Sequence, residues 1–292
     1  MNRPAITQAM IDAYDEYTHL TLDRRGFMEK LTQLAGSGAA AAAIAPLLAA
    51  NAAQAAIVAE DDARVKGQDI TYPGSKGEMK GYLVRPAAAG GNLGAVIVIH
   101  ENRGLNPHIR DVARRIALEG FIALAPDFLS PLGGTPSDED KAREMFGRLA
   151  PEQTVADGLA TVAYLKQIDG GNGKVGAVGF CWGGGVVNDL AVNAPDLDAA
   201  VAYYGRQPKT EDVANIHAPL LLHYAGMDER INAGIEPYKQ ALEAQGKKFT
   251  IYVYEGAQHA FNNDTSEARY NKAAADLAWG RTIAFLKEKL GG

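Results

Sequence analysis

The chain has 292 residues, of which 47% are hydrophobic and 22% are charged, and its formal net charge is −6 at pH 7. This length and apolar content are enough for a globular domain with a sizeable buried core. The mixed signs of the charges and the lack of a Lys/Arg cluster exclude a typical nucleic-acid-binding protein.

The N-terminal part of the chain has the features of an export signal. Arg24 and Arg25 open the pattern R-R-x-F-x-x-K, which is followed by a weakly apolar, alanine-rich run over residues 31–50. Residues 53–55, Ala-Gln-Ala, form a suitable A-x-A cleavage site. We therefore predict a twin-arginine signal peptide over residues 1–55 that is removed, and a mature domain over residues 56–292.

This assignment also predicts a partner and a compartment. The twin-arginine export machinery would carry the folded chain to the periplasm. The alternative is an arginine pair on an ordinary amphipathic helix. Because the apolar run is weak and Pro46 interrupts it, we expect a removable signal and no stable membrane anchor. A monomer or a small homo-oligomer is the expected state.

After the predicted cleavage site, strand and helix patterns alternate over about 235 residues. An opening β-hairpin is predicted from residues 70–73 and 79–84. Helical patterns follow over residues 107–119, 137–149, 151–167, 183–194, 234–245 and 266–290. The alternation predicts a single-domain α/β fold, with a mostly parallel central sheet and helices on both faces. The helix over residues 137–149 would be either a short lid or a solvated surface helix.

The first buried strand, residues 94–99, leads into the loop Glu101-Asn102-Arg103. In open parallel α/β sheets, ligands and catalytic groups gather at the carboxyl ends of the strands. This loop is therefore placed to supply one N–H group of an oxyanion hole, and Asn102 is the candidate.

Residues 175–185 carry the strongest chemical signal in the chain. A β-branched run leads into G-F-C-W-G around Cys181, which has the spacing of a nucleophile elbow. Glycines two residues before and after the nucleophile leave room for a strained strand-to-helix turn. Cys181 is the only cysteine, and a position at the first turn of a helix favours its thiolate. The N–H group of Trp182 would be the second oxyanion donor; the alternative is a buried structural cysteine.

An acid and then a histidine follow the elbow, which is the chain order expected after a nucleophile elbow. Asp228 comes just after the apolar run 219–225, and His259 comes after the alternating run 249–254. Both residues would converge with Cys181 at one edge of the sheet. Taken singly, an aspartate such as Asp228 is more often a turn former, and a loop histidine such as His259 is more often an exposed or capping residue. Their order and placement favour a catalytic triad.

Several other polar residues are weaker candidates. Glu101 either controls the proton of the thiol or forms a salt bridge to Arg103 or Arg206. The remaining histidines that we considered show no pair with metal-ligand spacing, so no metal site is predicted: His100, His108, His217 and His223.

Together these motifs resemble the dienelactone hydrolase (carboxymethylenebutenolidase) family over roughly residues 65–290. The resemblance is carried by H-E-N-R-G-L from residue 100, G-F-C-W-G-G from 179, Y-Y-G from 203, G-M-D from 226 and G-A-Q-H-A-F from 256. It implies an α/β-hydrolase fold and hydrolysis of enol lactones and related esters. It also implies the triad Cys181, Asp228 and His259, with Glu101 as the carboxylate that controls the thiol.

One difference from the family concerns the substrate. Members of the muconate pathway resemble one another in holding the lactone carboxylate with two arginines, one after a Pro-Asp pair and one just after the catalytic histidine. Here Pro126-Asp127 is followed by F-L-S-P-L and His259 by A-F-N-N-D, so neither arginine is present. Arg103 and Arg206 either supply a replacement charge or form surface salt bridges. We therefore expect a broad hydrolase of small esters or lactones.

The predicted reaction is a two-step acyl transfer that needs no cofactor. Cys181 attacks the carbonyl carbon, and the N–H groups of Trp182 and Asn102 hold the oxyanion. His259 then activates water. Trp182 and Phe261 either line an apolar acyl pocket or pack in the core. The alternatives are acyl transfer to a periplasmic acceptor other than water and a non-catalytic binding module, whereas a disulfide-exchange role would need a second cysteine.

Overall fold

The computed structural model describes residues 5–19, 21–49, 56–88 and 90–291, and the structural statements below refer to these residues. The strands are β1 (Val65–Pro73), β2 (Glu78–Pro86), β3 (Leu93–Ile99), β4 (Ile122–Asp127), β5 (Gly171–Phe180), β6 (Ala199–Tyr203), β7 (Leu220–Ala225) and β8 (Phe249–Tyr254). The helices are α1 (Gln8–Thr18), α2 (Arg24–Ala35), α3 (Gly38–Leu48), α4 (Pro107–Leu118), α5 (Glu139–Phe146), α6 (Pro151–Lys166), α7 (Trp182–Asn193), α8 (Glu229–Asn232), α9 (Ile235–Ala244) and α10 (Lys272–Leu290), with 3₁₀ turns η1 (Ser130–Leu132) and η2 (Thr210–Asn215).

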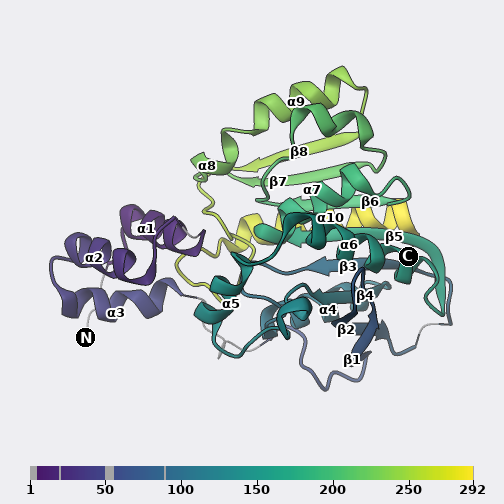
Figure 1. Cartoon of the computed structure of the whole chain (residues 1–292), viewed down its shortest axis with the longest axis horizontal. Coiled ribbons are helices and arrows are strands. Elements are labelled where there is room, and N and C mark those ends of the chain that lie inside the picture. The colour runs from purple at the N-terminus through teal and green to yellow at the C-terminus, as the bar shows by residue number, and fades with distance from the viewer. Residues whose placement is uncertain (1–4, 20, 50–55, 89, 292) are drawn as a thin grey trace.

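The strands of the described residues form one eight-stranded sheet in the order β1-β2-β4-β3-β5-β6-β7-β8. The pairs β1–β2 and β2–β4 are antiparallel, and every other neighbouring pair is parallel. The opening hairpin and the mostly parallel sheet are therefore confirmed. Parallel pairing brings the carboxyl ends of β3, β5, β6, β7 and β8 to one edge, where the loops after these strands lie together (Figure 1).

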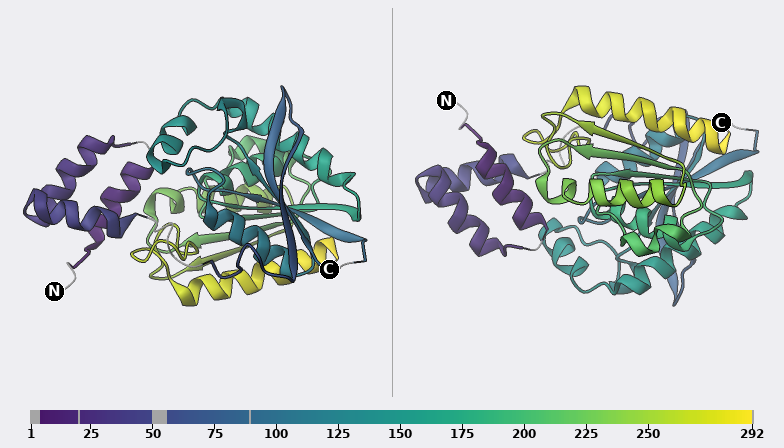
Figure 2. Two further views of the ribbon diagram at one scale, coloured as in Figure 1. Left: turned by 90° about the horizontal axis from the view of Figure 1, so that it is seen from below. Right: turned by 90° about the horizontal axis from the view of Figure 1, so that it is seen from above.

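Helices cover both faces of the sheet, as Figure 2 shows. The core on one face includes residues of α4 and α10, and the core on the other face includes residues of α6, α7 and α9. Along β3, Ile97 packs into one core and Val98 into the other, and both are fully buried. Such a strand reads as a continuous apolar run because neither of its faces meets water. The predicted single-domain α/β fold is confirmed.

The last helix begins later than its sequence pattern suggests. The pattern indicated a start at residue 266, whereas α10 begins at Lys272. The Asn271 side chain accepts a hydrogen bond from the Ala274 N–H group at 3.1 Å and so caps the helix there. Residues 260–271 instead form turns that hold Ser266 and Arg269 buried beside the loop after β8.

The helices α1, α2 and α3, called the N-terminal helices below, form a small unit of their own at the carboxyl edge of the sheet (Figure 1). Their own apolar cluster includes Met10, Tyr14, Phe27, Leu31 and Ile44. Among the described residues, no single helix is long and apolar enough to cross a membrane, and only the bent pair α2 and α3 passes that test jointly. The predicted cleavage site at residues 53–55 lies outside the described residues.

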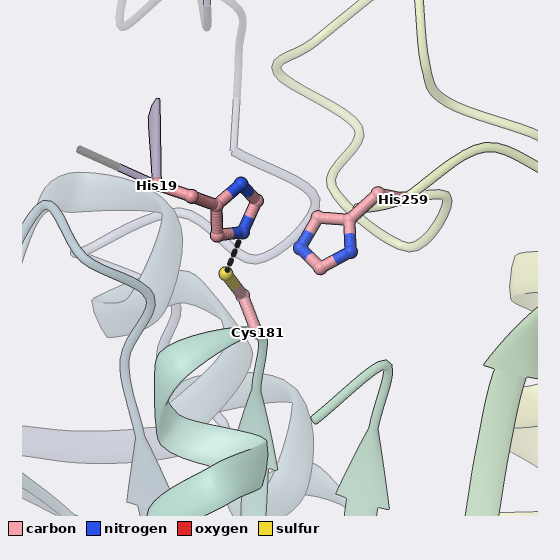
Figure 3. A group of neighbouring side chains, drawn as sticks. All are labelled: His19, Cys181 and His259. Atoms are coloured by element: carbon pink, nitrogen blue, oxygen red, sulfur yellow. Dashed lines mark hydrogen bonds between the residues drawn. The ribbon is translucent and has the colours of Figure 1, made fainter. Parts of the chain in front are cut away.

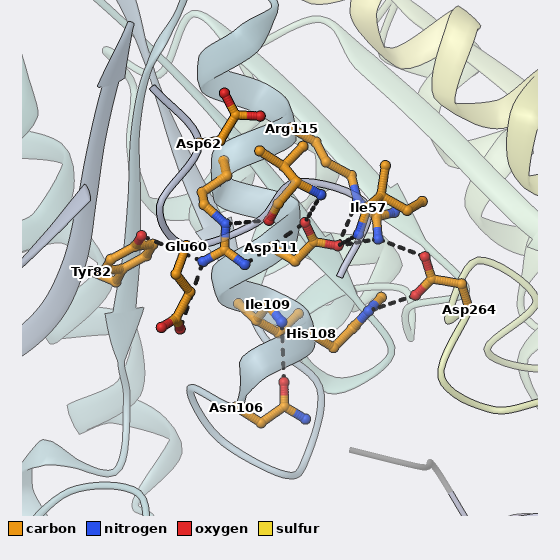
Figure 4. A network of polar contacts seen from close by, with 12 residues as sticks. Ile57, Glu60, Asp62, Tyr82, Asn106, His108, Ile109, Asp111, Arg115 and Asp264 are labelled. Atoms are coloured by element: carbon orange, nitrogen blue, oxygen red, sulfur yellow. Dashed lines mark hydrogen bonds and ion pairs between the residues drawn. The ribbon is translucent and has the colours of Figure 1, made fainter. Parts of the chain in front are cut away.

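The α/β body, residues 57–291, begins with an anchored segment. The Asp111 carboxylate on α4 accepts hydrogen bonds from the N–H groups of Ile57 and Val58, at 3.1 and 2.8 Å (Figure 4). Arg115 pairs with both Asp111 and Asp264, and so ties α4 to the loop after β8. Burial alone would raise the pKa of Asp264, but His108 and Arg115 outweigh it and lower this pKa to about 2.

Candidate active site

The backbone around Cys181 forms a strained turn between β5 and α7. Cys181 has φ 55° and ψ −115°, a conformation that L-residues rarely adopt. A Cβ atom on Gly179 would lie 2.2 Å from the Gly183 carbonyl oxygen, and one on Gly183 would lie 2.5 Å from the carbonyl oxygens of Ile99 and His100. Glycine is therefore required at both positions, which is the reason for the G-x-C-x-G spacing.

The acid and the histidine predicted from the sequence lie together. Asp228 follows β7 and His259 follows β8, and His259 Nδ1 lies 2.5 Å from Asp228 Oδ2. Both residues are buried, with 7% and 3% of their surface exposed. Because Nδ1 carries the proton toward the carboxylate, Nε2 of His259 is the atom left for chemistry, and it has no hydrogen-bond partner among the described residues.

Charge stabilises the protonated form of His259. Burial alone would lower the pKa of this imidazole, but the charges of Cys181 and Asp228 outweigh burial and raise the pKa well above 6.5. Burial would likewise raise the pKa of Asp228, and the neighbouring His259 outweighs it and holds this pKa below its usual value. The three groups therefore form one electrostatic unit.

The loop after β3 brings Glu101 to the same place. A small cavity is lined by Glu101, Asn102, Cys181 and His259 together. Glu101 is 9% exposed, and its Oε2 accepts a hydrogen bond from Asn263 at 2.7 Å, whereas its Oε1 has no partner among the described residues. The side-chain amide nitrogen of Asn102 donates to the carbonyl oxygen of Thr18.

A cavity of about 300 Å³ opens in front of Cys181. Its apolar wall includes Phe146 of α5 with Trp182 and Val186 of α7, and its polar rim includes Arg206 and Arg230. Trp182 stacks on the buried His100 ring, with ring centroids 5.5 Å apart. Because α5 residues line the cavity, the helix that the sequence placed as a lid or a surface helix forms one of its walls.

The end of α1 forms a further wall of this cavity. Thr18 and His19 line it, and His19 Nε2 lies 3.5 Å from Cys181 Sγ. The His19 ring also meets the His259 ring edge-on, with centroids 4.7 Å apart (Figure 3). Burial, His259 and Arg230 all lower the pKa of His19 well below 6.5, so its imidazole is neutral.

Side chains of the α/β body hold α1 in place. Asp15 on α1 pairs with the buried Arg269 at 3.2 Å. The Tyr17 hydroxyl donates to Asp140 Oδ1 at 2.6 Å. Arg143 donates to the Tyr17 carbonyl oxygen at 2.9 Å, and its guanidinium carbon lies 4.0 Å from the centroid of the Tyr17 ring.

The two arginines named as substrate-binding candidates are both paired. Arg103 is buried; it donates to the Glu139 carbonyl oxygen at 3.0 Å and lies 3.4 Å from Asp140. Arg206 lies 2.5 Å from Asp189 at the cavity rim and remains half exposed. Phe261 is fully buried in the core and is absent from the lining of the large cavity.

Sequence reasoning missed the contribution of α1 and of Arg269. His19 lies 162 residues before Cys181 in the chain, so no spacing rule links the two. A usable signal existed, because the buried positions of α1 include Met10, Ile11, Tyr14 and Tyr17, which follow the helical i, i+3/i+4 spacing. This pattern indicates a helix that packs against something.

Comparisons with known proteins agree with this geometry. The family model described as "Dienelactone hydrolase family" matches residues 79–290. A protein of Escherichia coli (strain K12) named "Putative carboxymethylenebutenolidase" is 36% identical over 242 residues, covering 78% of this chain and 89% of the relative. A protein of the same name from Saccharolobus solfataricus is 31% identical over 258 residues, which cover 75% of this chain and 98% of the relative. The crystal structure of a "Putative Dienelactone Hydrolase" from Klebsiella pneumoniae superposes with a TM-score of 0.70 at 31% identity, covering 77% of this chain and 99% of that one.

Proposed function

Since this chain belongs to the dienelactone hydrolase family, and is an ester or lactone hydrolase, we propose that it works through a covalent thioester on Cys181. One observation carries the proposal: the only thiol stands on a strained elbow, and a buried imidazole with a free Nε2 faces it. Asp228 holds the other nitrogen of that imidazole.

In the first step, the Cys181 thiol gives its proton to His259 Nε2, and the sulfur attacks the carbonyl carbon so that a C–S bond forms. The negative oxygen accepts hydrogen bonds from the backbone N–H groups of Trp182 and Asn102. Trp182 is the first residue of α7, so its N–H group has no acceptor within the helix. The C–O bond then breaks, and the alkoxide takes the proton from His259 Nε2.

In the second step, water attacks the thioester. His259 Nε2 removes a proton from the water, the C–S bond breaks, and the acid leaves. Asp228 keeps the imidazole in one orientation through both steps. Glu101 shares a small cavity with Cys181, and its unpartnered Oε1 supports a role in holding the thiol neutral until substrate binds.

The substrate class follows from the cavity. The part of its wall that belongs to the body is apolar, with Phe146, Trp182 and Val186, and suits small esters or lactones of broad structure. Arg206 is one of two rim cations, with Arg230, that a substrate carboxylate would meet, and in binding one it would give up its pairing with Asp189. If Arg206→Ala leaves the KM for a dienelactone unchanged and simple aryl acetates are turned over faster, a dienelactone is not the substrate.

The test of the reaction is release of p-nitrophenol from p-nitrophenyl acetate by the wild type and by Cys181→Ala. We expect steady release by the wild type and a loss of at least about 10³-fold in the variant. Circular dichroism and the Tm of both proteins control for folding. Equal rates in two folded proteins would refute the thioester.

We also propose that the chain is exported to the periplasm by the twin-arginine route and then cleaved near residue 55. Support comes from the exposure of the arginine pair: the side chains of Arg24 and Arg25 at the start of α2 are 75% and 86% exposed. Such exposure lets an export receptor read the motif in the folded chain.

The export test is fractionation of cells that produce the wild type or the variant Arg24→Lys/Arg25→Lys. We expect the shortened wild type in the periplasm and the full-length variant in the cytoplasm. The variant Arg64→Lys, an exposed arginine of the body, is the matched control. A full-length wild type found in the cytoplasm would refute export.

A further inference from the structure

Three donor atoms of the kind that bind transition metals face one another in the uncleaved chain. They are His19 Nε2, Cys181 Sγ and His259 Nε2, and all lie within 4.8 Å of one another. Figure 3 shows that they come from three separate segments: the end of α1, the elbow, and the loop after β8. Only Cys181 and His259 belong to the proposed triad.

Both imidazoles turn Nδ1 toward an acceptor, which leaves Nε2 as the atom that a metal can bind. His19 Nδ1 lies 2.6 Å from the Asp15 carbonyl oxygen, which can only accept, so Nδ1 carries the hydrogen and Nε2 presents its lone pair. His259 Nδ1 is held by Asp228 in the same way. A carbonyl or carboxylate on the outer nitrogen is the usual arrangement behind metal-binding histidines, since it orients the ring and makes the inner nitrogen a better donor.

The distances suit a tetrahedral ion. With Zn–S near 2.3 Å and Zn–N near 2.05 Å, tetrahedral geometry places sulfur and nitrogen about 3.6 Å apart and two nitrogens about 3.3 Å apart. The distance from Cys181 Sγ to His19 Nε2 is 3.5 Å. The pairs that involve His259 lie within 4.8 Å, so this side chain closes by up to about 1.5 Å when an ion binds. Its Nε2 is buried and has no hydrogen-bond partner among the described residues that would oppose the shift.

We propose that the uncleaved chain binds one Zn²⁺ ion through His19, Cys181 and His259, with the fourth coordination position open to the cavity. Thiolate and neutral imidazoles are the ligand types that zinc prefers, and three protein ligands with one open position make a tetrahedral site. This proposal goes beyond the hydrolase activity and does not depend on it. The effect of zinc on hydrolysis rests on the proposed function: while zinc is bound, the sulfur cannot attack a substrate.

Two neighbours respond when the ion binds. Arg230 Nη2 lies 2.9 Å from His19 Nε2, and this exposed side chain must swing toward solvent. Metal binding needs the lone pair of His259 Nε2, so a proton on that atom leaves when the ion binds. His19 needs to lose none, because its imidazole is already neutral.

The experiment is titration of the metal-free, full-length protein with Zn²⁺ by calorimetry and with Co²⁺ by absorption, in the absence of substrate. We expect one ion per chain, tetrahedral cobalt bands, and a sulfur-to-cobalt charge-transfer band that Cys181→Ala removes. Since losing one outer-sphere partner already weakens metal affinity by about 10–100-fold, His19→Ala should weaken it by at least about 100-fold. His217→Ala, at an exposed histidine, is the matched control and should leave the affinity unchanged.

Three results would overturn the site: no binding at one ion per chain, no sulfur band in the wild type, or equal affinity in His19→Ala. If circular dichroism shows that His19→Ala is misfolded, His19→Gln replaces it, because glutamine keeps the polarity and much of the size while removing the imidazole ligand. Since no substrate is present, a failure here leaves the thioester proposal intact, and a failure of p-nitrophenol release leaves the metal site intact.

Discussion

The two sides of the active-site cavity are built in different ways. In the α/β body, the backbone itself places the groups: β5, the elbow and α7 fix Cys181, and the ends of β7 and β8 fix Asp228 and His259. On the other side, α1 is held by separate side-chain contacts from Arg143 and Arg269. The comparison teaches that the chemistry is built into the fold of the body, whereas the wall formed by α1 depends on a few contacts that single substitutions can break.

The largest expected effect is a loss of turnover when Asp228, in the body, is changed. Asp228→Asn removes the charge that orients His259, so we expect turnover of p-nitrophenyl acetate to fall on the order of 10³-fold with the fold intact. Asp196→Asn, at an exposed aspartate that does not line the cavity, is the control. A loss below about tenfold would mean that the carboxylate is not part of the catalytic unit.

A smaller effect is expected where the body holds α1. Arg143→Met keeps the apolar stem but removes the hydrogen bond to Tyr17 and the contact with its ring, which together contribute about 1–3 kcal/mol to docking. Hydrogen exchange should therefore quicken in residues 8–48 and stay unchanged in the central strands. Arg148→Met, an exposed arginine just beyond α5, is the matched control, and equal exchange in both variants would show that Arg143 does not hold α1.

The ion pairs of Asp264 with His108 and Arg115 predict that the stability of the body falls in acid. The pKa of Asp264 is lowered from 3.8 to about 2, so its contribution is fully present above pH 3.8 and is lost as the pH falls toward 2. Because this carboxyl group is partly exposed, we expect about 1 kcal/mol or less. Urea unfolding between pH 6 and pH 2.5 should show a shallower acid loss in Asp264→Asn than in Asp276→Asn, an exposed control. If the free energy of unfolding fell equally with pH in both variants, the Asp264 carboxylate would not contribute to stability.

The smallest expected effect tests one hydroxyl group of α1. Tyr17→Phe removes the hydrogen bond to Asp140 and keeps the ring stacked on Phe27, with centroids 4.8 Å apart. We expect docking of the N-terminal helices to weaken by about 0.5–1.5 kcal/mol, read as faster hydrogen exchange in α1. Tyr164→Phe, on α6 of the body, should leave that exchange unchanged.

The same contrast explains how much the sequence could predict. The strand runs, the elbow glycines and the order of Cys181, Asp228 and His259 are local signals, and the parallel sheet turns them into neighbours without further information. The later start of α10 was missed because the helical pattern continues through residues 266–271, while the Asn271 cap decides where the helix begins. Capping by one side chain is a weak signal beside a continuous periodicity.

The position of His19 could not be predicted in the same way. It depends on the packing of α1 against α5 and on the pairing of Asp15 with Arg269, which are 254 residues apart. The interpretation of residues 1–55 as a signal peptide explained the arginine pair and the alanine run after α1. It gave residues 1–22 no role in the folded structure. The aromatic spacing of α1 was the one sequence feature that pointed to a docking partner.

The measurement that tests the thioester most directly is intact-mass spectrometry after a short incubation with p-nitrophenyl acetate. For the wild type, the account predicts a transient gain of one acetyl group during steady p-nitrophenol release, with no adduct in Cys181→Ala. A well-folded wild type that shows neither adduct nor release, or an adduct that persists in Cys181→Ala, would contradict the assignment of Cys181 as the nucleophile.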